Sequence, residues 1–150
     1  MKVVIQRVSK ASVSVDNKII ASIQQGVLIL LGIEAQDSQV DIDWLSNKII
    51  NLRIFDDQNG VMNDSLLKVN GDVIVVSQFT LHASTKKGNR PSYIKSAKPT
   101  LAFPLYQKFI STLESKLSKK VQTGEFGAHM SLEIHNDGPV TITLDTKNKF

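Results

Sequence analysis

Residues 77–81, SQFTL, interrupt an apolar run with side chains that could bind a ligand. The preceding DVIVV is typical of a buried β-strand, yet Ser77, Gln78 and Thr80 follow where further aliphatic residues would fit. Phe79 offers a flat face on which a nucleic-acid base can stack, and its polar neighbours could supply hydrogen bonds. The alternative is structural, because Ser and Thr commonly bond to nearby backbone groups. These five residues leave both interpretations open.

A second polar segment, NDGPVT, occupies residues 136–141. Asn, Asp and Gly are ordinary turn residues, so a hairpin turn is the simplest interpretation. The proline adds an alternative, because a Gly138–Pro139 bond can be cis at a cost of roughly 0.5–1 kcal/mol. A cis bond would point two successive carbonyl groups the same way and form a rigid main-chain wedge. The sequence leaves the isomer open.

Positive charge is concentrated between residues 73 and 113. This stretch has six cations and no acid, whereas acids slightly outnumber cations in residues 1–72 and equal them in residues 114–150. Lys86, Lys87 and Arg90 lie close together in it, in the segment KKGNR. Such a stretch is typical either of a surface that binds nucleic acid or phosphate, or of a solvated loop.

The sequence lacks the residues that most catalytic motifs require. It has no cysteine, and His82, His129 and His135 lie in no spacing typical of metal ligands. No phosphate-binding loop, dinucleotide-binding motif or serine nucleophile elbow is present. We therefore expect no metal and no cofactor. An enzyme with this sequence would depend on backbone groups, hydroxyls or the substrate itself.

Secondary structure must position these residues, and the order of strands and helices expected from the sequence predicts an α+β fold. We expect a single domain, residues 1–150. Alternating apolar residues, a turn at Asp16-Asn17 and the apolar run VLILLGI predict sequential antiparallel strands at the start of the chain. Two further strands, MSLEIH and VTITLD, are expected to form a terminal hairpin through NDGP. The sheet is therefore predicted to be mostly antiparallel, or an open barrel.

Two helices should pack on this sheet. Ser38 is a good N-cap, and apolar residues at helical spacing predict a helix over 38–52. The second helix is predicted from about Thr100 to Lys119, with Pro104 in its first turn, where its missing N–H costs little. The N-terminus lacks the features of a signal peptide, and no apolar run reaches membrane-spanning length. We expect a cytoplasmic protein that makes no membrane contact.

Taken together, SQFTL, the basic KKGNRPS loop and NDGPVT resemble the signature motifs of the D-aminoacyl-tRNA deacylase (D-tyrosyl-tRNA(Tyr) deacylase) family. QRVSKASVSV, NLRIFDDQNGVMNDSLL and TGEFGAHMSLEIHNDGPVT are also similar to that family. The resemblance extends from Met1 to about Asp145, and neither signature motif departs from the family pattern.

The resemblance implies a hydrolase that removes a D-amino acid, or glycine mischarged on tRNA(Ala), from the terminal adenosine of tRNA. It implies a homodimer with each active site near the subunit interface and a cis Gly-Pro bond that reaches into the partner's site. Gly138 and Pro139 would form this filter against L-amino acids, and Arg7 would hold it. The pocket would be lined by Ser77, Gln78, Phe79 and Thr80, and the tRNA would meet Lys86, Lys87 and Arg90.

The sequence leaves alternatives open for the chemical step and for the function. The chemical step would be substrate-assisted, with attack by water or the adjacent ribose hydroxyl and backbone N–H groups near Phe79 and Thr80 stabilising the oxyanion. Thr80 as a nucleophile ranks second, because no motif supplies a base to activate it. A non-catalytic, dimeric tRNA- or RNA-binding module is the rival function, and a dimeric scaffold without a ligand is a third.

Overall fold

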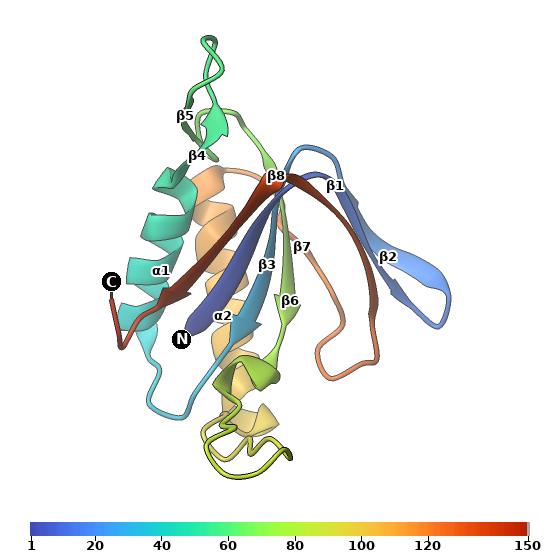
Figure 1. Cartoon of the computed structure of the whole chain (residues 1–150), viewed down its shortest axis with the longest axis vertical. Coiled ribbons are helices and arrows are strands. Elements are labelled where there is room, and N and C mark those ends of the chain that lie inside the picture. The colour runs from blue at the N-terminus through green and yellow to red at the C-terminus, as the bar shows by residue number, and fades with distance from the viewer. Residues whose placement is uncertain (150) are drawn as a thin grey trace.

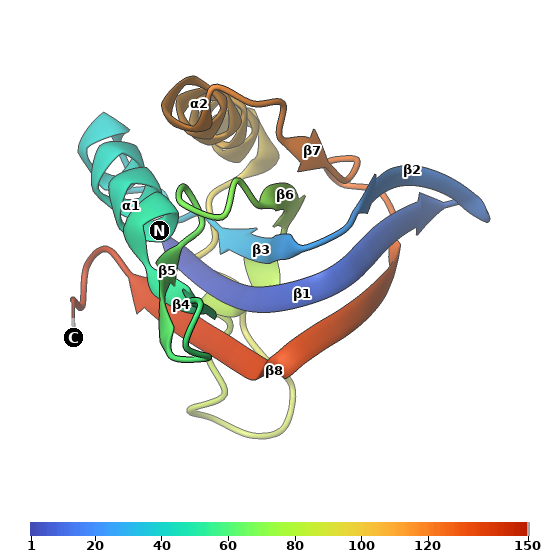
Figure 2. The same ribbon diagram turned by 90° about the horizontal axis from the view of Figure 1, so that it is seen from above.

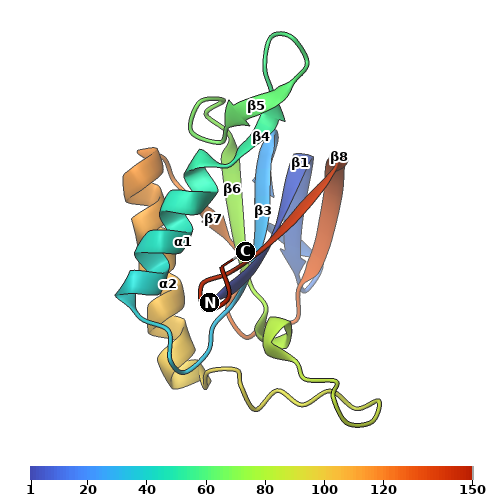
Figure 3. The same ribbon diagram turned by 60° about the vertical axis from the view of Figure 1, so that its left-hand side comes forward.

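The computed structural model describes residues 1–149. Two helices cover one face of a strongly curved six-stranded sheet, and a two-stranded sheet stands at one end (Figure 1). Figure 3 shows both helices on the same side of the main sheet. The main sheet consists of β1 (Lys2–Val15), β2 (Lys18–Ile23), β3 (Gly26–Gly32), β6 (Asp72–Ser77), β7 (Gln122–Thr123) and β8 (Ser131–Asp145). The small sheet consists of β4 (Arg53–Asp56) and β5 (Met62–Ser65). The two helices are α1 (Gln39–Asn51) and α2 (Pro99–Leu117).

The long strand β1 organises the main sheet. Along one edge it pairs first with β3 and then with β2, and along its other edge it pairs with β8. These three pairings are antiparallel, whereas β3 with β6 and β6 with β7 are parallel. The predicted α+β class, with a mostly antiparallel sheet and two main helices, is confirmed. The turn at Asp16-Asn17 is also present, with both residues at positive φ.

The terminal hairpin predicted at NDGP is wrong. MSLEIH and VTITLD lead into and out of one bent strand, β8, and both halves pair with β1. Between the pairs Val8–Asn136 and Gln6–Thr141, β1 has one residue and β8 has four. Residues 137–140 therefore form a bulge opposite Arg7, which we call the β8 bulge. Figure 2 shows the resulting bend in β8.

The two predicted helices are present, with one correction. Ser38 precedes α1, and its N–H donates to the Asp41 carboxylate (2.9 Å), as a capping arrangement requires. Helix α2 begins at Pro99, so Pro104 lies in the second turn and not in the first. At that position the missing N–H removes a regular helical hydrogen bond to the carbonyl of Thr100.

Apolar residues of the helices and the sheet form the main core. Ile42, Leu45 and Ile49 of α1 and Phe109 and Leu113 of α2 are almost fully buried against β3 and β6. Burying each such side chain contributes about 1.5–3 kcal/mol. Within residues 1–149, neither helix combines the length and apolar character needed to cross a membrane.

Candidate functional site

The predicted SQFTL site lies where β6 ends. The strand stops at Ser77, and the chain turns into a short 3₁₀-helix, η1 (Phe79–His82). The Gln78 N–H donates to the Leu31 carbonyl of β3 (2.8 Å), which fixes the start of η1. Gly32 permits this approach, because a Cβ there would lie 3.0 Å from Leu81 Cβ and 3.1 Å from the Gln78 carbonyl oxygen. The polar residues therefore leave the strand and do not continue it.

A cavity of about 580 Å³ lies beside η1. Ser77, Gln78 and Phe79, three of the predicted site residues, line it. Thr80 is not part of the lining, and its hydroxyl accepts a hydrogen bond from the Gln78 side-chain amide. Gln78 is therefore held between the cavity and Thr80, which gives its side chain a fixed orientation.

The rest of the cavity wall comes from segments in which no residue was predicted from the sequence to belong to the site. Besides apolar residues in or next to β3, β6 and β8, these are the loop before α2, the start of α2 and the approach to β8, with Tyr93, Ser96, Pro99, Ala102, Phe126, His129 and Met130. His129 is exposed, as expected of a histidine outside any motif, yet it lines the cavity. The segment FGAHM resembles the family, but it has no charge pattern or ligand spacing that would have marked its side chains.

Tyr106 supports this wall from the core side. Its ring lies 5.4 Å from that of Phe126, and its hydroxyl donates to the Val75 carbonyl of β6 (3.1 Å). Burial raises the pKa of Tyr106 to about 12, so the hydroxyl stays protonated as a donor. Within residues 1–149, no group of three or more His, Asp or Glu side chains could hold a metal ion. The expected absence of a metal or cofactor stays a prediction.

Arg7 lies opposite the β8 bulge and contacts it directly. Its Nε donates to the Asp137 carbonyl (3.1 Å) and lies 3.2 Å from the Asp137 carboxylate. Its Nη1 donates to the Ile54 carbonyl (2.8 Å) and lies 3.3 Å from Asp56 Oδ1. The Arg7 side chain is largely buried, so these charge-assisted bonds tie the bulge firmly to β1 and β4.

Gly138 occupies a position that excludes a side chain. Its φ of +123° is rare for L-residues, and a Cβ there would lie 3.1 Å from Arg7 Nη2 and 2.9 Å from Val140 Cγ2. The Gly138–Pro139 peptide bond is cis. Asn136 closes the base of the bulge, since its side-chain amide donates to the carbonyls of Arg7 (2.9 Å) and Val140 (3.0 Å). From the sequence, Asn136 was expected only to be a turn residue.

The cavity and the β8 bulge do not meet within one chain. Arg7 pairs with Val27 near the start of β3, whereas Ser77 pairs with Leu31 near its end. Four residues of strand separate these positions, about 13 Å along β3. Figure 1 shows the bend of β8 at one end of the sheet and η1 at the other. The predicted site residues therefore form two groups, one around Phe79 and one around Gly138.

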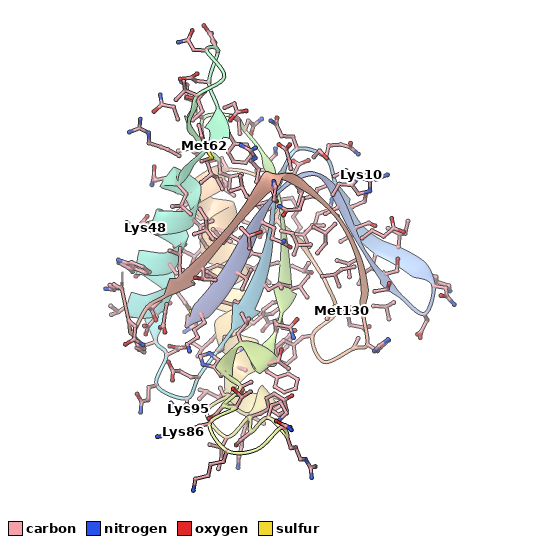
Figure 4. The ribbon with its side chains drawn as sticks, in the orientation of Figure 1. Lys10, Lys48, Met62, Lys86, Lys95 and Met130 are labelled. Atoms are coloured by element: carbon pink, nitrogen blue, oxygen red, sulfur yellow. The ribbon has the colours of Figure 1, made fainter. Side chains whose placement is uncertain are left out.

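The predicted tRNA-binding residues Lys86, Lys87 and Arg90 lie on the exposed loop after η1. Figure 4 shows Lys86 of this loop, and Lys95 just beyond it, at the same end of the molecule as η1. Ser84 and Ser92 exchange two backbone hydrogen bonds (2.8 and 2.9 Å), which close the loop at its base. The loop thus carries its cations at the η1 end of the molecule, away from the β8 bulge (Figure 1, Figure 4).

Comparison with known proteins identifies the family of the chain. The sequence model of the D-Tyr-tRNA(Tyr) deacylase family matches residues 4–145, which include both SQFTL and the β8 bulge. The chain belongs to this family. It is 68% identical to the D-aminoacyl-tRNA deacylase of Flavobacterium psychrophilum and 64% identical to that of Bacteroides fragilis, in each case over 149 residues and 99% of both chains.

Solved structures show the same fold. The c-Myc DNA unwinding element binding protein has a TM-score of 0.92 and 38% identity to this deacylase-family chain, with 97% of this chain and 98% of the other covered. A probable eukaryotic D-amino acid tRNA deacylase has a TM-score of 0.83, covering 95% and 97% of the two chains. Its identity is 16%, so this second likeness concerns the fold alone.

Proposed function

We propose that the protein hydrolyses the ester bond of D-aminoacyl-tRNA, and of glycyl-tRNA mischarged on tRNA(Ala), releasing free tRNA and the amino acid. The observation that carries this proposal is the full-length match to the deacylase family together with a cavity lined by Ser77, Gln78 and Phe79. Phe79 provides a surface for the terminal adenine, and Ser77 and Gln78 provide hydrogen-bonding groups. The reaction is a proofreading step of translation, and the cytoplasmic location stays a prediction.

Selection against L-amino acids is the role of Gly138 and Pro139. Enantiomers carry identical groups, so an obstacle separates them better than affinity for their side chains. Main-chain carbonyls at the β8 bulge would occupy the space that an L-side chain needs, whereas a D-side chain points away. Glycine has no side chain to reject and enters as well. The Arg7 contacts support this role, because an obstacle discriminates only if it is held in place.

The protein acts as a homodimer in this proposal. The β8 bulge and the cavity lie at different ends of the sheet in one chain, so Gly138 reaches a cavity only if that cavity belongs to a partner. Each active site then combines the cavity of one protomer with the bulge of the other. The basic loop with Lys86, Lys87 and Arg90 attracts the acceptor end of the tRNA through phosphate contacts.

The chemical step is substrate-assisted hydrolysis. Water oriented by the ribose 2′-hydroxyl attacks the carbonyl carbon, or the 2′-hydroxyl attacks first and water then cleaves the resulting 2′-ester. The acyl C–O bond to the ribose breaks, and the ribose oxygen takes the proton that the water gives up. The backbone N–H groups of Phe79 and Thr80 stabilise the oxyanion, and within residues 1–149 neither makes a hydrogen bond. Attack by Thr80 ranks second, because its hydroxyl accepts from Gln78 and hydrogen-bonds to no basic group among the described residues that could take its proton.

Thr80→Ala and a substrate with a 2′-deoxy terminal ribose distinguish these routes. With D-Tyr-tRNA, Thr80→Ala should retain hydrolysis within about tenfold of wild type, whereas the 2′-deoxy substrate should react at least about a hundredfold more slowly. The measurement is the single-turnover rate of ester loss. The opposite pattern, with a dead Thr80→Ala variant and a reactive deoxy substrate, would establish the nucleophile route instead.

A non-catalytic nucleic-acid-binding module is the second candidate. It is favoured by the acid-free basic stretch 73–113 and by the name of the 38% identical structure, the c-Myc DNA unwinding element binding protein. Such a module would bind D- and L-aminoacyl-tRNA equally and leave the ester intact. Following both tRNA binding and ester loss in the same samples separates the two functions.

A further inference from the structure

Tyr93 extends the aromatic surface of the cavity to its edge. The ring centroids of Phe79 and Tyr93 lie 5.0 Å apart, with an angle of 73° between the planes. In such an edge-to-face pair, at least one face of each ring is not covered by the other ring. Phe79 is 55% exposed and Tyr93 41% exposed, and both line the cavity. An accessible aromatic face therefore lies next to the adenosine-sized space.

Hydrogen bonds hold Tyr93 in a defined position. Its carbonyl accepts from the Ser96 N–H (3.0 Å), and the Ser96 hydroxyl donates to the Phe79 carbonyl (2.9 Å). The Ala97 N–H in turn donates to the Ile33 carbonyl after β3 (2.9 Å). Tyr93 thus belongs to a short turn that is tied to η1 and to the sheet, although the loop before it is exposed.

Cations flank Tyr93 in the sequence. Lys86, Lys87 and Arg90 precede it, and Lys95 and Lys98 follow it. Among residues 1–149 none of these five side chains forms an ion pair, whereas lysines elsewhere in the chain pair with Asp37, Asp41, Asp64, Asp72, Glu114 and Asp145. A nucleotide chain that leaves the cavity past Tyr93 would therefore meet positive charge that no protein carboxylate neutralises.

We propose that Tyr93 stacks on the base of the nucleotide that immediately precedes the terminal adenosine of the substrate. This rests on the proposed function, in which the terminal adenosine and its ester occupy the cavity beside Phe79. The preceding nucleotide then lies at the cavity edge, where Tyr93 offers a ring face and the loop offers charge for its phosphate. Stacking accepts any base, because every base has a π-face. Tyr93 is therefore a binding residue for the second nucleotide.

Three small esters test this assignment: D-tyrosyl-adenosine, D-tyrosyl-cytidylyl-adenosine, and the same dinucleotide with an abasic ribose in place of cytidine. For wild type, kcat/KM should be roughly tenfold higher for the cytidine-containing dinucleotide than for its abasic form, as expected for one stacked base. Tyr93→Ala should bring this ratio close to one, and Tyr93→Phe should keep it. Ile94→Ala, at a neighbouring residue that is 92% exposed, is the matched control and should keep the wild-type ratio.

Two results would overturn the assignment. One is a wild-type enzyme that hydrolyses the cytidine and abasic dinucleotides equally well. The other is a Tyr93→Ala variant that keeps the wild-type ratio while its rate falls equally on all three esters, since Tyr93 would then belong to the adenosine site. If wild type hydrolyses neither the three D-esters nor D-Tyr-tRNA itself, the proposed function is refuted, and this inference with it.

Discussion

Gly138 is the residue at which a single methyl group should have the largest effect on the β8 bulge. Its φ is +123°, and an added Cβ would contact Arg7 Nη2 and Val140. Gly60 is the matched control, because it also has positive φ (+72°) but nothing lies within 4 Å of an added Cβ. Gly138→Ala should lower the free energy of unfolding by about 2–4 kcal/mol, against about 1 kcal/mol for Gly60→Ala.

Urea unfolding of both variants checks this prediction, and hydrolysis of L-Tyr-tRNA provides a second measurement. A displaced bulge should let Gly138→Ala hydrolyse L-Tyr-tRNA faster than wild type, whereas Gly60→Ala should not. Equal destabilisation by the two substitutions would show that the Arg7 contact places no limit on residue 138.

The sequence identified some of these residues by type but not their environment. SQFTL marked Ser77, Gln78 and Phe79, because polar side chains after an apolar strand are visible locally. The contact between Arg7 and Asp137 joins residues 130 positions apart, so it depends on the register of β1 with β8. Only the family resemblance assigned Arg7 a role. Tyr93 and His129 were not singled out, since neither lies in a motif with a chemical meaning of its own.

Pro104 should destabilise α2, because it lies in the second turn and removes the hydrogen bond to the Thr100 carbonyl. The residue is exposed, so an alanine there loses little packing. Pro104→Ala should raise the free energy of unfolding by about 1–2 kcal/mol, measured by urea unfolding. Lys108→Ala, at an exposed position one turn further on, should change it by less than about 0.5 kcal/mol. A destabilised Pro104→Ala variant would mean that the proline makes a packing contribution in α2.

The start of α1 is joined to the C-terminal segment by a charged pair that should make stability depend on pH. Burial raises the pKa of Asp41, but hydrogen bonds from Lys147, Thr146 and Ser38 outweigh it and hold this pKa well below its usual value of 3.8. A carboxylate with a lowered folded-state pKa stabilises the fold above about pH 4 and loses this contribution as the pH falls further. The hydrogen bond to Asp41 raises the pKa of Lys147.

Asp41→Asn should therefore lower the free energy of unfolding at pH 7 by about 1–3 kcal/mol and have a much smaller effect near pH 2. Asp43→Asn, at an exposed position on the same helix, is the control and should have little effect at either pH. The measurement is urea unfolding at both pH values. An Asp41→Asn effect that is the same at pH 7 and pH 2 would contradict the role of the charged carboxylate.

Local patterns predicted the elements better than their connections. Capping and apolar periodicity located α1 within a residue or two, because those signals act within one or two turns of chain. NDGP predicted a hairpin, since Asn, Asp and Gly are ordinary turn residues and glycine also occurs in bulges. The strand β1 decides between the two: it is long enough to pair with both halves of β8, and this length is not a property of the NDGP segment.

The arrangement of the whole molecule predicts that each active site needs two chains. Arg7→Ala should release the β8 bulge, and Ala128→Trp should fill the cavity, of which Ala128 forms part of the wall. Each variant alone should lack selective hydrolysis of D-Tyr-tRNA. Mixed dimers from co-expression contain one intact site, which pairs the cavity of the Arg7→Ala chain with the bulge of the Ala128→Trp chain, and should regain about half of the wild-type activity per dimer. Mixed dimers without activity would place each site within a single chain.

The relative rate of hydrolysis of D-Tyr-tRNA and L-Tyr-tRNA by one preparation of the wild-type protein tests the account most directly. Release of the amino acid from both substrates should be followed at equal concentrations of tRNA. We predict that the D-ester is hydrolysed at least about a hundredfold faster than the L-ester, because in the proposed mechanism the β8 bulge obstructs only the L-side chain. Equal rates for the two enantiomers, or no loss of either ester, would contradict this prediction and the proposed function.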